Sequence, residues 1–193
     1  MKQFLTAIPL LVVGLVGAHQ AEASIITSLV SKTNSTFTYR ADLTADQQID
    51  ATNQAFGTVY DFGTIIGSIS STGLLNSGFT FTTALTNTAA FQTGPIDDPN
   101  SLNIRFTANA GTTIGANTAL GTFTVTSPFS FARLASFDGQ ASKFAPGTGA
   151  NDTPTGNVGL VSVPSAVPEP TTMLSLGAGL LGVGFFSFKR RKV

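Results

Sequence analysis

The sequence contains no cysteine and no tryptophan, and its single histidine is His19. Without cysteine, the fold cannot use disulfide bonds and must rest on its hydrophobic core. Catalytic triads and most zinc sites draw on histidine or cysteine. His19 lies in an N-terminal stretch with the pattern of a removable leader, so residues 24–166 lack the residue types for both classes of site.

Charged residues are also scarce, and glutamate is absent between residues 24 and 166. This region has five basic and eight acidic residues, so its net charge is −3 although the whole chain is neutral. A slightly acidic domain without a basic patch argues against nucleic acid as a partner. Only aspartate could supply the carboxylate pair that a glycosidase needs. We therefore predict a protein that is not an enzyme and that has no cofactor.

Residues 1–23 have the pattern of a secretory signal peptide. Lys2 provides the positive n-region, and residues 4–16 form an apolar stretch that is too short to span a bilayer. Ala21-Glu22-Ala23 matches the small-residue cleavage pattern, which places the first residue of the exported chain at Ser24. The sequence thus predicts the secretory translocon and signal peptidase as partners.

The C-terminus has three consecutive parts. Val167-Pro168-Glu169-Pro170 is stiff and extended because proline fixes φ. Residues 171–188 carry no charge, and as a helix they would span about 27 Å, close to the thickness of a bilayer core. The basic run Lys189-Arg190-Arg191-Lys192 should remain in the cytoplasm by the positive-inside rule. Together these parts predict a single-pass C-terminal transmembrane helix.

This three-part arrangement resembles the PEP-CTERM sorting signal of bacterial exosortase substrates. The resemblance implies recognition at the Pro-Glu-Pro motif, a transient stay in the membrane and proteolytic processing by an exosortase. It also implies a Gram-negative-type envelope, often one with an exopolysaccharide system. It implies nothing about the activity of the preceding domain.

Residues 24–163 are predicted to form an all-β domain. Thr and Phe favour strands, and apolar residues alternate with polar ones in several short runs. Turn-forming clusters of Gly, Asn and Asp separate these runs. About eight strands are expected, at residues 25–30, 37–43, 58–62, 79–82, 102–108, 122–126, from 129 onward, and 158–163. Residues 44–55 could form a short helix, and a loop is equally consistent with the spacing of their aspartates.

The expected architecture is a single β-sandwich. It is followed by a Pro-rich tether over residues 164–170, the transmembrane helix over 171–188 and the basic tail over 189–193. Four short motifs within the domain resemble a recurrent ectodomain of PEP-CTERM proteins. They are Thr58-Val59-Tyr60-Asp61-Phe62-Gly63, Asp97-Asp98-Pro99, Leu120-Gly121-Thr122-Phe123 and Gly156-Asn157-Val158-Gly159. This second resemblance implies no functional site.

Two ligands fit the composition. Asp97, Asp98 and Asn100 gather hard oxygen donors of the kind that calcium prefers, and the alternative is a turn stabilised by their own side chains. Threonine-rich runs at residues 80–83 and 122–126 could offer flat polar rows to a polysaccharide, or could be ordinary solvated strand faces.

These observations predict a non-enzymatic protein that is exported across the inner membrane to the cell envelope. A C-terminal anchor would hold it until processing sends it to the outer surface or the extracellular matrix. The alternative function is an exopolysaccharide- or calcium-binding surface module.

Overall fold

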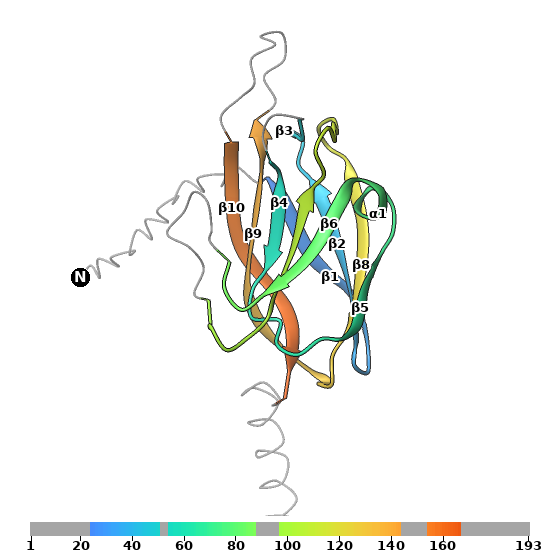
Figure 1. Cartoon of the computed structure of the whole chain (residues 1–193), viewed down its shortest axis with the longest axis vertical. Coiled ribbons are helices and arrows are strands. Elements are labelled where there is room, and N and C mark those ends of the chain that lie inside the picture. Colours follow the sequence, from blue (N-terminus) through green and yellow to red (C-terminus); the bar gives the residue numbers. More distant parts are fainter. Residues whose placement is uncertain (1–23, 51–53, 88–96, 144–153, 167–193) are drawn as a thin grey trace, which may run out of the picture.

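The computed structural model describes residues 24–50, 54–87, 97–143 and 154–166, and these form two antiparallel β-sheets (Figure 1). The all-β prediction is confirmed. Ten strands are present in the described residues, together with one short helix, where about eight strands were predicted.

The smaller sheet has the strand order β1-β2-β8-β5. Its bounds are β1 Ile25–Thr33, β2 Thr36–Leu43, β5 Ile66–Ser71 and β8 Ala119–Thr126. The helix α1, Leu74–Gly78, follows β5 and buries Leu75. The sequence predicted turn-forming residues, with no strand or helix, between the runs at residues 58–62 and 79–82, and both β5 and α1 lie there.

The larger sheet has the order β10-β9-β4-β7-β6, and β3 pairs with β9 beside this path. The bounds are β3 Gln47–Gln48, β4 Phe56–Val59, β6 Phe79–Ala84, β7 Asn103–Ala108, β9 Phe131–Lys143 and β10 Pro154–Ser165. The strand β3 and the bridge between Ile49 and Ile114 lie where a short helix was considered. No helix is present in the described part of that stretch, residues 44–50 and 54–55.

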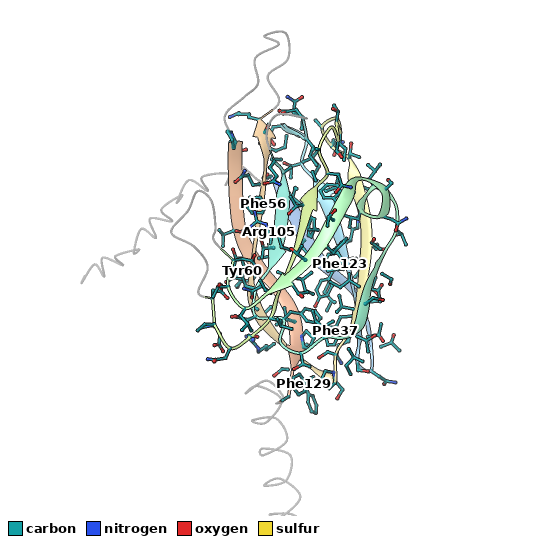
Figure 2. The ribbon with its side chains drawn as sticks, viewed as in Figure 1. Phe37, Phe56, Tyr60, Arg105, Phe123 and Phe129 are labelled. Atoms are coloured by element: carbon teal, nitrogen blue, oxygen red, sulfur yellow. The ribbon has the colours of Figure 1, made fainter. Side chains whose placement is uncertain are left out.

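Aromatic side chains fill the space between the sheets. Phe123 of β8 stacks on Tyr39 of β2 with ring centroids 5.0 Å apart. It also meets Phe81 at 5.4 Å and Phe106 at 5.7 Å, both from the opposite sheet. These are the residues that alternate inward in the sequence, so the pattern predicted their burial correctly. Figure 2 shows Phe123 and Phe37 among the side chains between the sheets.

The C-terminal strand extends beyond the predicted domain boundary. β10 ends at Ser165, two residues past the expected end of the domain at residue 163. Within the described residues, no helix has the length and apolar character required to cross a bilayer. The predicted signal peptide and the predicted transmembrane segment, residues 171–188, lie outside the described residues, as does the basic tail.

Candidate functional site

The sorting-signal residues follow directly after β10. The last described residue is Ala166, so Val167, Pro168, Glu169 and Pro170 fall outside the described residues. The same holds for Ala21 and Ala23 at the predicted signal cleavage point and for Lys189, Arg190, Arg191 and Lys192. In the described residues, the chain leads into the sorting signal from the end of β10, which is an edge strand of the larger sheet.

The calcium candidates take part in local hydrogen bonds. Oδ1 of Asp98 accepts from the backbone N–H of Asn100 at 3.0 Å and from its side-chain Nδ2 at 3.1 Å, which is an Asx turn. Asp97 has partners outside this turn. Its Oδ1 accepts from Asn103 Nδ2 at 2.9 Å and its Oδ2 accepts from the N–H of Asn87 at 3.2 Å. Among the described residues, no group of three or more His, Cys, Asp or Glu side chains is arranged to hold a metal ion.

Asp61 and Asn103 connect the same loop to the sheet. Asp61 has a positive φ of 51°, and its N–H donates to Asn103 Oδ1 at 2.7 Å. Its Oδ1 accepts from the N–H of Asp98 at 2.8 Å, and its carbonyl oxygen accepts from Arg133 Nη2 at 2.8 Å. Aspartate tolerates the left-handed region better than most residues because its side chain bonds locally. Parts of two sequence motifs, Asp61 and Asp97-Asp98, therefore meet in one structural network.

A second polar cluster lies on the outer face of the larger sheet. The Tyr60 hydroxyl donates to Asp138 Oδ2 at 2.8 Å, and Thr58 pairs with both Arg105 and Asp138 across the neighbouring strands. The Arg105 guanidinium lies 3.6 Å from the centroid of the Phe56 ring. Figure 2 shows Phe56, Arg105 and Tyr60 together on this side of the sandwich. Sequence reasoning did not identify this cluster.

Burial sets the electrostatics of the Tyr60–Asp138 pair. Asp138 is 5% exposed, and this desolvation raises the pKa of its carboxyl above the ordinary value of 3.8. Thr58, the Tyr60 hydroxyl and the positive charge of Arg105 oppose that rise. Burial, followed by the charge of Asp138, raises the pKa of Tyr60 as well. A carboxyl with a raised pKa could serve as a general acid only if substrate could reach it, and Asp138 is almost fully enclosed.

The raised pKa of Asp138 makes stability depend on pH. The folded state holds the Asp138 proton more tightly than the unfolded state does. The protonated carboxyl therefore contributes to folding stability in full below about pH 4, and this contribution is lost as pH rises through the folded pKa. We expect Asp138→Asn to flatten this part of the stability profile, because asparagine does not titrate and still accepts from Tyr60.

The measurement is urea unfolding of the wild-type domain and of the Asp138→Asn domain between pH 4 and 8. Asp46→Asn is the control, since Asp46 is exposed. If the free energy of unfolding of Asp138→Asn fell as steeply with rising pH as that of the wild type, Asp138 would be ruled out as the titrating group.

Residues 166–192 match the family model described as the PEP-CTERM protein-sorting motif. The chain carries a PEP-CTERM sorting motif. The match begins at Ala166, the residue directly after β10, so the motif and the β-domain adjoin without an intervening segment. No curated protein matches the sequence.

The match confirms the resemblance inferred from the three-part C-terminus. It indicates an exported, envelope-associated protein whose processing partner is an exosortase. The β-domain lies ahead of the PEP-CTERM motif, as expected for a domain that the motif delivers.

Proposed function

We propose that the chain is a non-enzymatic cell-envelope or extracellular-matrix protein that is delivered, briefly anchored and then cut through its PEP-CTERM motif. The translocon and signal peptidase would release residues 24–193 on the far side of the inner membrane. Residues 171–188 would cross the membrane once, with Lys189–Lys192 in the cytoplasm. An exosortase would then cut near Pro168-Glu169-Pro170 and free the β-domain for the outer surface or matrix.

The observation that carries this proposal is the position of the motif. It starts where the last described strand stops, so cutting there would remove no strand and no core residue of the described part of the domain. Val161 and Val163, the last core residues among those described, both precede the motif. The domain can therefore remain folded after it loses the segment.

Replacing Pro168, Glu169 and Pro170 together with alanine is expected to abolish processing, because the stiff extended conformation and the carboxylate are both lost. The uncut precursor should accumulate in the inner-membrane fraction, where immunoblotting would detect it at a larger mass. Pro154→Ala is the matched control, since it removes a proline at the start of β10, outside the motif. Normal processing of the triple variant would refute the proposed role of these residues.

The alternative, a polysaccharide-binding module, draws support from one surface. On the outer face of the smaller sheet, Thr36 pairs with Thr126, Thr38 with Thr124, and Arg40 with Thr122. The hydroxyls of Thr38 and Thr124 lie 3.1 Å apart, so at this pair the two neighbouring strands present closely spaced oxygens. Cross-strand threonine pairs also stabilise a sheet in their own right. Calorimetry with purified exopolysaccharide, with and without calcium, separates the two roles.

A further inference from the structure

One end of the sandwich brings together segments from both sheets. Ile66, at the start of β5, and Thr36, at the start of β2, both pair with Thr126 at the end of β8. The N–H of Ser127 donates to the carbonyl oxygen of Ser35 at 2.9 Å, which joins the β8–β9 loop to the β1–β2 turn. Phe131, the first residue of β9, pairs with Ser165, the last residue of β10. These segments lie at the lower end of the molecule in Figure 1.

Several apolar side chains are exposed at this end. Phe131 is 44% exposed, Ile66 is 51% exposed, and Val30, a few residues before the β1–β2 turn, is also 51% exposed. Phe129 is partly exposed in the β8–β9 loop, and Figure 2 places it at the same end. We name Val30, Ile66, Phe129 and Phe131 the apolar end. Single exposed apolar residues are ordinary, but these four lie on β1, β5, the β8–β9 loop and β9, and all of these segments reach the end of the sandwich from which the chain leaves.

The chain leaves the domain through the apolar end. Five residues, 166–170, separate the end of β10 from residue 171, where the uncharged segment begins. Fully extended, they reach about 20 Å. Under the proposed function, on which this step rests, residues 171–188 lie in the bilayer, and the apolar end is then the part of the domain nearest to the membrane surface.

We propose that the apolar end is a membrane-docking surface, used while the chain is still anchored. Phe129 and Phe131 would enter the boundary between headgroups and acyl chains, with Val30 and Ile66 beside them. The short tether makes this contact intramolecular, so a weak affinity is sufficient. The occupant is a neutral bilayer, because the domain's net charge of −3 disfavours anionic lipids. Of the described cations nearest in sequence to this end, Lys32 is exposed, and Arg133 is half-buried and donates to the Asp61 carbonyl oxygen. Docking holds the Pro-Glu-Pro segment at the membrane surface until it is cut.

The absence of tryptophan from the chain allows a direct test. Phe131→Trp and, separately, Ile66→Trp each introduce one fluorophore at an exposed position of the apolar end. Leu74→Trp is the matched control, because Leu74 is exposed in α1 at the opposite end (Figure 1). Uncut protein that retains its C-terminal segment is reconstituted into phosphatidylcholine vesicles with brominated acyl chains. Vesicle flotation reports anchoring, and loss of emission reports docking.

We expect all three variants to float with the vesicles. Bromination near the headgroup should reduce the emission of Phe131→Trp and Ile66→Trp roughly twofold, while that of Leu74→Trp stays unchanged. Flotation with no quenching of the two end variants would overturn docking and leave anchoring intact. A fourth variant, Leu160→Trp, probes the outer face of β10, where Leu160 is 66% exposed. Quenching of Leu160→Trp without quenching at the apolar end would also overturn docking, since β10 and not the apolar end would then face the membrane. Failure to float would overturn both the anchor and the docking that depends on it.

Discussion

Replacing Phe123 with alanine is expected to lower the free energy of unfolding of the β-domain by about 3–5 kcal/mol. Phe123 is fully buried at the centre of the aromatic core, where it contacts Tyr39, Phe81 and Phe106. Truncation removes the contacts that the ring makes with both sheets and leaves a cavity between them. Domains of this size are stable by about 5–15 kcal/mol, so the loss is a large fraction of the total.

Urea unfolding of residues 24–166, followed by circular dichroism, measures the change. Phe131→Ala is the control, because Phe131 is 44% exposed and its truncation should have a much smaller effect on stability. Phe123→Leu should fall between the two, since it keeps most of the buried volume. Equal stabilities for Phe123→Ala and Phe131→Ala would contradict the assignment of Phe123 to the centre of the core.

Gly139→Ala is expected to destabilise the domain by about 1–3 kcal/mol or more through a backbone clash. Gly139 pairs with Gly57 on one side and with Asn157 on the other, in a row across the larger sheet. A Cβ at Gly139 would overlap the carbonyl oxygen of Ile25, and no change of rotamer can relieve a clash with backbone. The start of β1 would have to move away from the larger sheet. This movement would also weaken the hydrogen bond from the Ser24 N–H to Asn157 Oδ1.

Gly115→Ala is the matched control for this change. A Cβ at Gly115 has no neighbouring atom within 4 Å, and its φ is not in the positive range. Thermal unfolding of the two variants should show a clear fall in midpoint for Gly139→Ala and little change for Gly115→Ala. If both alanine variants had the same midpoint of thermal unfolding as the wild type, the close approach of β1 to Gly139 would be refuted.

The sequence predicted the strands that have large inward side chains. β2, β6, β7 and β8 alternate Phe, Tyr, Leu, Ile or Val with polar residues, and all four were expected. β5 was missed because its sequence, Ile66-Gly67-Ser68-Ile69-Ser70-Ser71, is rich in turn-forming residues, and its pairing with β8 holds it extended. β3 was missed because two glutamines make no pattern, and β9 supplies the hydrogen bonds.

The polar clusters could be predicted only in part. Asp97, Asp98 and Asn100 are neighbours in sequence, so their shared turn was foreseeable, and Asx bonding was the alternative considered for them. Tyr60 and Asp138 are far apart in the chain, and β4 and β9 bring them together through strand pairing alone. No local spacing indicates such a contact. The one available signal was Tyr60 itself, a polar-tipped aromatic residue whose burial requires a partner.

The PEP-CTERM motif is proposed to carry the folded domain through the envelope and then to be removed. The most direct test is the intact mass of the protein from fractionated cells, with and without the exosortase. We predict that cells with the enzyme contain a form that begins at Ser24, ends near Pro170 and lies outside the inner membrane. Cells without it should retain residues 171–193 in the inner-membrane fraction. A mature protein that keeps Val193 in cells with an active exosortase would contradict the account.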